Sequence, residues 1–286
     1  MATFPVTPDP SKVLLIDTSK WQNDPTTPKD IDFELMKANG CQGVIMKVGQ
    51  GGFLDRDWKV NLENAKKAGL PVGGYWYYDN KFTPKPQAKR FLEETQETLE
   101  LGLWLDLEDR SQGQYRGWKR WYDFLEEIKL ARPNSKIGIY TGYYYWTEYT
   151  QGSGIPPASL KYFEQYPLWI ASYNPVPKIP KPWETHTIWQ FTDLLDGKFY
   201  GVESKELDGN YFNGTKDEYE KLFGISSAPV ENPQPSQKFI VGLQEYALSL
   251  GGTVQELDAI STASSSKRGE VVMILNYILN LDRGVE

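Results

Sequence analysis

The chain has 286 residues, of which 40% are hydrophobic and 24% charged, and its formal net charge is −7 at pH 7. This balance is typical of a soluble globular protein, and the acidic charge argues against a nucleic-acid partner, which would favour a basic patch. One cysteine, Cys41, and one histidine, His186, exclude a disulfide within the chain and a site built from several histidines. We therefore expect no metal and no other cofactor.

The apolar runs of the chain and its first residues indicate where the protein is made and where it acts. No apolar run approaches the ~20 residues that a transmembrane helix needs, so we expect no membrane insertion. Residues 1–5 lack a basic segment followed by an apolar one, so we expect no secretory signal. A protein of this kind would be made in the cytoplasm and would need a separate route to a substrate outside.

Five strand–helix units follow one another from the start of the chain. Runs that are typical of buried strands lie at 13–17, 43–48, 71–78, 103–109 and 136–140. Segments with helical spacing lie between them at 31–39, 57–68, 85–101 and 116–131, and the first three stop at a glycine. Apolar strands that alternate with helices are typical of a parallel barrel or a doubly wound sheet.

The rhythm changes after residue 140. Strands are expected at 168–172, 187–191 and 202–208, without long regular helices between them. Five βα units followed by three β units would close an irregular eight-stranded TIM-like barrel of the (β/α)5(β)3 type, an α/β fold. Active sites of such barrels lie at the carboxyl ends of the strands. Four acids fall near strand ends in this reading: Asp17, Asp106, Glu108 and Asp208.

The strand at 103–109 carries the strongest chemical signal. Its leucines alternate with Trp104, Asp106 and Glu108, so both carboxylates should project from one face, roughly 6.5–7 Å apart along the strand. Like-charge crowding and partial desolvation would raise one pKa and leave the other group ionised. The pattern predicts a general acid beside a carboxylate, although an isolated D-x-E is more often a solvated edge strand.

A small module is expected after the barrel. Residues 226–237 are rich in Pro and Ser and are typical of a linker. Helical spacing resumes at 239–250, 253–260 and 267–281. We therefore expect a barrel domain at 1–225, a linker at 226–237 and a helical module at 238–286, which would serve wall targeting or homo-oligomerisation.

Short motifs, each ordinary by itself, follow one another in a fixed order along the barrel region. They are Asp17-Thr18-Ser19-Lys20-Trp21-Gln22, Gly74-Tyr75-Trp76-Tyr77, Asp106-Leu107-Glu108, Ile139-Tyr140-Thr141, Leu168-Trp169-Ile170-Ala171-Ser172-Tyr173, Trp189-Gln190-Phe191-Thr192 and Asp208-Gly209-Asn210-Tyr211-Phe212. A turn, a cap or a strand core would explain each one alone. Together they resemble the glycoside hydrolase family 25 lysozymes, the Chalaropsis-type muramidases, over roughly residues 13–223.

The resemblance implies cleavage of the β-1,4 bond between N-acetylmuramic acid and N-acetylglucosamine in bacterial peptidoglycan. By position, Glu108 matches the family's general acid and Asp106 its neighbouring carboxylate. Asp17 and Asp208 match the other two acids of the cleft. We expect six aromatic side chains to bind substrate: Tyr75, Tyr77, Tyr140, Trp169, Tyr173 and Trp189. Trp76 stands where many members carry His, which bears on subsite shape.

The mechanism stays open between retaining, inverting and substrate-assisted hydrolysis. Asp106 and Glu108 lean the same way from one strand and would flank one side of a sugar, which favours attack by the 2-acetamido carbonyl. In that scheme Glu108 protonates the leaving oxygen, and Asp106 or Asp208 orients the acetamide. Asp17 would hold the acid pair in register.

The biological role also has alternatives. The leading hypothesis is a phage endolysin that is made without a signal, reaches the wall by a holin-type route and lyses the host. A second hypothesis places the enzyme on the phage particle, where it would cut the wall during infection. A third is a catalytically silent barrel that binds glycan, against which the intact acids argue.

Overall fold

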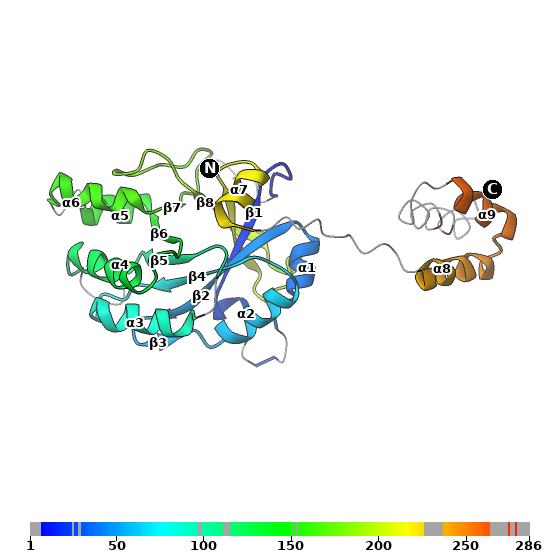
Figure 1. The fold of residues 1–286 in the computed structure, drawn as a ribbon, viewed down its shortest axis with the longest axis horizontal. Helices are drawn as coiled ribbons and strands as arrows, with labels where there is room; N and C mark the ends of the chain where they lie inside the picture. The colour runs from blue at the N-terminus through cyan, green and yellow to red at the C-terminus, as the bar shows by residue number, and fades with distance from the viewer. Residues whose placement is uncertain are drawn as a thin grey trace. The chain divides into compact units, whose positions relative to one another are not determined.

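The computed structural model describes residues 7–24, 26–27, 30–96, 99–110, 115–150, 152, 154–225, 237–263, 274 and 278. The chain divides into two compact units, residues 1–225 and residues 226–286 (Figure 1). The expected linker lies outside the described residues except for Gln237. Its assignment therefore stays a prediction.

The first unit is built on one sheet that closes into a barrel. Among the described residues this sheet has nine strands: β1 (Leu14–Thr18), β2 (Cys41–Gln50), β3 (Phe53–Leu54), β4 (Val72–Tyr77), β5 (Leu103–Leu107), β6 (Ile137–Gly142), β7 (Leu168–Ala171), β8 (Ile188–Asp196) and β9 (Glu206–Phe212). Parallel pairing runs from β1 through β2, β4, β5, β6 and β7 to β8. The last strand, β9, is antiparallel to both β8 and β1 and closes the barrel, while β3 forms a short hairpin on β2.

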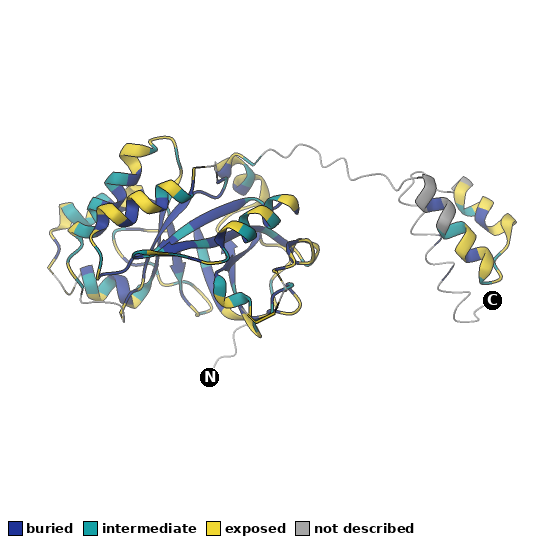
Figure 2. Ribbon diagram, turned by 90° about the horizontal axis from the view of Figure 1, so that it is seen from below, coloured by how far each residue is buried: buried dark blue, intermediate teal, exposed yellow. Residues whose placement is uncertain are grey.

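Helices cover the outside of the barrel (Figure 1). They are η1 (Lys20–Gln22), α1 (Phe33–Ala38), α2 (Trp58–Lys67), α3 (Pro84–Glu94), α4 (Lys119–Ala131), α5 (Tyr143–Thr150), α6 (Pro157–Lys161), η2 (Tyr162–Gln165) and α7 (Lys216–Phe223). In α4 the buried residues Trp121, Phe124, Leu125 and Ile128 recur at helical spacing, so one stripe faces the barrel. Figure 2 shows the consequence, with buried strands inside and exposed outer faces on the helices.

The alternation of side chains on the strands separates two cores. On β5 the leucines point outward and join the large cluster beneath the helices. Trp104 points inward and belongs to a second cluster inside the barrel. Its ring lies 5.7 Å from that of Trp169, which in turn lies 4.6 Å from that of Tyr140. These three rings, the aromatic plug, fill the barrel just below the position of Asp106.

The expected (β/α)5(β)3 barrel is confirmed, with three local differences. Helix α3 ends at Glu94, well before residue 101. The Arg132 guanidinium, from the end of α4, donates to the carbonyls of Leu92 and Thr95 and so caps α3 from outside its own sequence. Helices α5 and α6 follow β6, although the aromatic run at 143–146 has little helical propensity. The third difference concerns the last strand.

The last strand runs in the opposite direction from the one expected. The sequence predicted a strand at 202–208 with Asp208 at its carboxyl end, but β9 spans Glu206–Phe212 and is antiparallel. Asp208 therefore lies near the beginning of its strand. Because the direction is reversed, that beginning lies at the same end of the barrel as the carboxyl ends of the parallel strands.

The second unit contains α8 (Gln237–Ser249) and α9 (Val254–Ala263), with Gly251 at a φ of 95° in the turn between them. Among the residues described in this unit, five buried side chains pack together: Ile240, Ala247, Leu257, Ile274 and Ile278. The helices expected at 239–250 and 253–260 agree with α8 and α9 to within a few residues. The helix expected at 267–281 lies outside the described residues apart from Ile274 and Ile278. Across the described part of the chain, no helix has the length and apolarity needed to cross a membrane.

We expect a chain of residues 1–225 to fold without the second unit, because both cores of the barrel are built from residues before 226. Its melting temperature should lie within about 3 °C of that of the barrel transition in the full chain. A chain ending at Phe212 is the matched control, since it loses α7, whose Tyr219 and Phe223 belong to the inner core. Calorimetry checks both. Failure of the 1–225 chain to fold would contradict the expectation.

Candidate active site

A polar cavity of about 240 Å³ opens at the carboxyl end of the parallel strands. It is lined by Asp17, Tyr75, Asp106, Glu108, Tyr140, Trp169, Tyr173, Gln190, Asp193 and Asp208. All four acids expected from the sequence are present, together with Tyr75, Tyr140, Trp169 and Tyr173. The structure thus brings together eight of the ten expected site residues and leaves out Tyr77 and Trp189.

Strand register places the cavity residues. Asp106 pairs with Tyr140 on the next strand, and Tyr140 pairs with Trp169 on the one after. Residues in register on parallel strands project to the same height, so these three side chains form a row across β5, β6 and β7. Tyr140 and Trp169 of this row also belong to the aromatic plug, so together with Trp104 below them they form the floor of the cavity.

Asp17 and Asp208 form one wall of the cavity. They are direct partners in the antiparallel pairing of β1 with β9. The Oδ2 atom of Asp17 accepts hydrogen bonds from the side-chain amides of Gln190 at 3.0 Å and Asn210 at 2.8 Å. A carboxylate that accepts two amide donors is held in the ionised form.

The two amides cannot turn away from Asp17, because their own oxygens are occupied. The Gln190 Oε1 atom accepts hydrogen bonds from the hydroxyls of Tyr140 at 2.9 Å and Tyr173 at 3.0 Å. The Asn210 Oδ1 atom accepts one from the indole of Trp169 at 2.7 Å. The aromatic floor therefore orients the amides, and the amides orient Asp17.

Burial raises the pKa of Asp17, and the Asn210 and Gln190 hydrogen bonds oppose that rise. Burial and the neighbouring Asp17 charge raise the pKa of Asp208 to about 9. At neutral pH Asp208 is therefore the protonated member of the pair and donates its proton to Asp17. Asp17 pairs with Asp208, and its charge also raises the pKa values of Asp106 and Glu108; its expected role in holding the Asp106/Glu108 pair in register stays a prediction.

Asp106 and Glu108 stand on another wall, on β5, which is separated from β1 by β2 and β4. The Asp106 side chain is deep, with the residue 3% exposed, and its Oδ1 atom has no hydrogen-bond partner among the described residues. Glu108 follows the end of the strand and is exposed at the mouth. Asp106 is therefore placed to contact a group inserted into the cavity, and Glu108 is placed to reach an atom at its opening.

Both carboxyls have raised pKa values. Burial raises the pKa of Asp106 well above its ordinary range, and the Glu108 charge adds to the rise. Burial and the Asp17 charge raise the pKa of Glu108, while Lys47 and the Tyr140 hydroxyl oppose it. The raised pKa values favour the protonated form of these carboxyls, which is the form that general acid catalysis needs.

Strand phase accounts for Trp189, one of the two aromatic residues that do not line the cavity, but not for Tyr77, which has the same phase as the cavity residue Tyr75. Gln190 points inward on β8, so Trp189 points outward, where it contacts Tyr211 and donates its indole N–H to the carbonyl of Ser172. Tyr77 is half-buried beside the cavity, with the Lys47 ammonium 4.7 Å from its ring centroid.

The departure from the family pattern at Trp76 lies away from the cavity. Its neighbour Tyr75 points inward, so the indole of Trp76 points into the layer beneath the helices. There it packs on Phe91 with ring centroids 5.7 Å apart, and its N–H donates to Gln87. Trp76 therefore does not shape the cavity wall.

Four other residues of the site were not expected from the sequence. Gln190 lies in the Trp189–Thr192 motif, and Asn210 lies two residues after Asp208, so it shares the strand face of Asp208. This alternation was a signal that could have identified both. Lys47 is a lone cation in the buried strand β2, and it lowers the pKa values of Asp106 and Glu108. Asp193 lies where the pairing of β8 with β9 shifts register, so strand alternation could not predict its direction.

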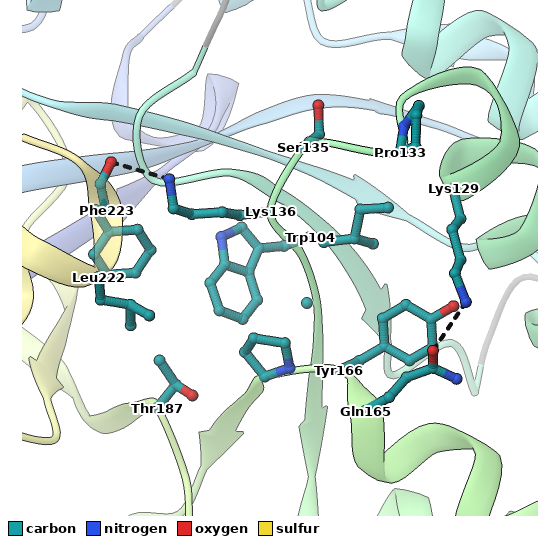
Figure 3. A pocket seen from close by; sticks show the side chains of 13 residues that line it. Trp104, Lys129, Pro133, Ser135, Lys136, Gln165, Tyr166, Thr187, Leu222 and Phe223 are labelled. Carbon is teal, nitrogen blue, oxygen red and sulfur yellow. Dashed lines mark hydrogen bonds between the residues drawn. The ribbon is translucent and has the colours of Figure 1, made fainter.

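A second cavity, of about 270 Å³, lies at the opposite end of the barrel, where β6 and β7 begin (Figure 3). Trp104, Pro133 and Phe223 contribute to its largely apolar lining, and no Asp or Glu lines it. Lys136 is held at its edge by a hydrogen bond to the carbonyl of Phe223. This cavity has no group that could protonate a leaving oxygen.

The Asp17/Asp208 pair, called the acidic wall below, predicts how the stability of the protein depends on pH. The folded protein keeps the Asp208 proton up to about pH 9, whereas the unfolded chain releases it near about pH 3.9. Its contribution to stability is full below about pH 4 and is lost as the pH rises towards 9, by up to about 1.4 kcal/mol per pH unit. We therefore expect Asp208→Asn to raise the free energy of unfolding by about 1 kcal/mol or more at pH 8 and to change it little at pH 4.

Urea denaturation of the wild type and the variant at pH 4, 6 and 8 measures this. The exposed Asp30 is the matched control, and Asp30→Asn should leave the pH dependence unchanged. A loss of stability at pH 8 in Asp208→Asn would show that the ionised carboxylate supports the fold.

Comparison with known proteins agrees with the geometry. The model of glycosyl hydrolases family 25 matches residues 16–201. A Dictyostelium discoideum protein described as "Probable GH family 25 lysozyme 5" is 26% identical over 151 residues. The match covers 50% of this chain and 66% of that relative, a little under two thirds of its length.

Solved structures share the fold. The lysozyme from Streptomyces coelicolor is 25% identical with a TM-score of 0.61, and the match covers 73% of this chain and 96% of that one. The catalytic domain of endolysin ply40, from bacteriophage P40 of Listeria monocytogenes, is 22% identical with a TM-score of 0.55. This second match covers 74% of this chain and 98% of that one, and it is a likeness of fold alone.

Proposed function

The chain belongs to glycosyl hydrolases family 25 and is a glycoside hydrolase; from this membership we propose that it is an N-acetylmuramidase of bacterial peptidoglycan. The bond cut is the β-1,4 bond between N-acetylmuramic acid and N-acetylglucosamine. The observation that carries the proposal is the cavity with Asp106 and Glu108 on one wall and the Asp17/Asp208 pair on another. The aromatic rings of the cavity suit the apolar faces of sugars.

Glu108 is the proton donor in this proposal. Its carboxyl is exposed at the mouth, and burial of its surroundings raises its pKa. The proton goes to the glycosidic oxygen as the bond to the anomeric carbon breaks, and the N-acetylglucosamine side leaves with a free 4-hydroxyl. Glu108 is then a carboxylate and can take a proton from the water that completes hydrolysis.

Asp106 orients the 2-acetamido group of the muramic acid residue. Its Oδ1 atom lies deep in the cavity and makes no hydrogen bond among the described residues, so it is available to the acetamide N–H. The acetamide oxygen then attacks the anomeric carbon and forms a cyclic oxazolinium intermediate, which water opens with net retention. Direct attack by an Asp or by water is the alternative scheme.

Analysis of digested peptidoglycan by mass spectrometry tests the activity. A muramidase leaves N-acetylmuramic acid at each new reducing end, which borohydride reduction labels as muramitol. Glucosaminitol in its place would show that the other glycosidic bond is cut. Absence of any new reducing end would leave the silent glycan-binding barrel as the function.

We propose that the biological role is lysis of a bacterial host wall by a phage endolysin that reaches the wall through a holin-type pore. The separate second unit and the fold shared with an endolysin catalytic domain support this role. Bacteria that express the full chain should lyse only when a holin is co-expressed. If the gene lies among genes for phage tail proteins, the alternative role, an enzyme carried on the phage particle, would be favoured.

The second unit acts in this proposal as a wall-targeting or oligomerising module. Its two described helices leave Tyr246 and Val254 exposed. Sedimentation of the full chain with purified walls and its mass in solution separate the two roles. Wall binding that survives removal of residues 226–286, together with a monomeric mass, would exclude both.

A further inference from the structure

An exposed lysine and two tyrosines form a cluster beside the active-site cavity. The rim cluster consists of Tyr143, Tyr144 and Lys178. Tyr144 is 65% exposed, and Lys178 is exposed as well. The Lys178 ammonium donates to the Tyr144 hydroxyl at 2.9 Å and lies 5.1 Å from the centroid of that ring and 5.9 Å from that of Tyr143. The cation is thus held over aromatic faces.

The rim cluster lies at the same end of the barrel as the cavity. Tyr143 begins α5 directly after β6, the strand that carries the cavity residue Tyr140. Lys178 lies in the loop after β7, beyond the cavity residue Tyr173. The Ser172 hydroxyl folds this loop back by accepting the Lys178 backbone N–H at 3.1 Å. Both sides of the cluster therefore come from the carboxyl ends of two paired strands.

The backbone between the cavity residue Tyr140 and the rim cluster carries no side chain at Gly142. Gly142, the last residue of β6, lies between Tyr140 and Tyr143 and pairs with Ala171 of β7. A Cβ atom built at Gly142 would meet no heavy atom within 4 Å. The space directly above Gly142 is therefore open to a group that leaves the cavity on the side of Tyr143.

The charge of Lys178 is complementary to an anion. Five carboxyls line the cavity, but no ion pair among the described residues involves Lys178. The Tyr144 hydroxyl raises the pKa of Lys178, so the side chain stays charged. An isolated cation beside an acidic cleft attracts the acidic part of a substrate that the cleft itself would repel.

We propose that the rim cluster binds the acidic peptide that muramic acid carries on its lactyl group, with Lys178 pairing with a peptide carboxylate and Tyr144 packing on the peptide backbone. This inference rests on the proposed function for the identity of the glycan. It makes the enzyme selective for peptide-substituted strands. The rim cluster determines which strands bind, and proton transfer remains the role of Glu108.

Equilibrium binding tests the proposal in the full-length Glu108→Gln chain, which holds glycan without cutting it. The ligands are two glycan preparations of equal length, one with its peptides and one stripped of them by an amidase. We expect the peptide-bearing strands to bind more tightly. Lys178→Glu should reduce that preference by about fivefold, the upper range for one exposed ion pair, and Lys178→Arg should retain it. Raising NaCl from 50 to 500 mM should weaken it as well.

Lys161→Glu is the matched control, because this exposed lysine ends α6, which leads to the amino end of β7. Gly142→Leu adds a steric test. Its side chain would fill the open space above Gly142, so the preference for peptide-bearing strands should fall. An unchanged preference in Lys178→Glu, or an equal loss in Lys161→Glu, overturns the proposal. If the wild type releases no sugar fragments but the preference exists and depends on Lys178, the hydrolase function fails while the peptide site stands.

Discussion

Glu108→Gln is expected to lower kcat on peptidoglycan by a factor of about 10²–10⁴ while the fold and glycan binding persist. An amide of the same shape cannot protonate the leaving oxygen. A neutral amide in place of the protonated donor adds no charge to the crowded acid cluster. Stability should therefore not fall.

Release of reducing ends measures the rate, and thermal melting checks the fold. The exposed Glu184, which pairs with Lys181, is the matched control, and Glu184→Gln should keep full activity. If Glu108→Gln retains more than about a tenth of the wild-type rate, the donor is another carboxyl. Asp106, which also has a raised pKa, would then be the first candidate.

Glycan with de-N-acetylated muramic acid is expected to resist cleavage by about a hundredfold or more, because it lacks the internal nucleophile that sits next to the anomeric carbon. Binding should persist, since the glycan keeps its other contacts with the lining of the cavity. Chemical re-acetylation of the same strands should restore the rate. The rates of the three preparations, measured at equal concentration, check this.

The anomer formed first distinguishes the alternative schemes. NMR in the first minutes of reaction should show the β-anomer at the new reducing end, because two displacements at one carbon retain configuration. An initial α-anomer would rule out the acetamide as nucleophile. The Asp17/Asp208 wall, opposite the acid on β5, would then supply the base that activates water.

Sequence patterns predicted the first part of the barrel well because each element there follows its own local rule. Strands are apolar on both faces, and positive φ values at Gly40 and Gly69 match the expected stops of α1 and α2. The exceptions depend on tertiary structure. Arg132 caps α3 from another helix, and the direction of β9 depends on which edge of the sheet it closes. Neither contact has a local signature.

The site was predictable where strand phase was clear. Alternation placed Asp106 and Glu108 together, and the structure places both at the cavity. Alternation also separates Trp189 from Gln190, but only register shows which of the two points inward. The Asp17/Asp208 pair depends on contact between the first and last strands of the barrel. Residue spacing cannot predict that contact, so only the family resemblance placed both acids in the site.

The pairing of β1 with β9 has a consequence for synthesis. Asp17 leaves the ribosome early, whereas Asp208 and the amide donors at 190 and 210 follow after most of the barrel. The acidic wall, with the hydrogen bonds that orient it, exists only once the sheet has closed. A nascent chain that has not reached residue 212 therefore lacks the Asp17/Asp208 wall of the cavity.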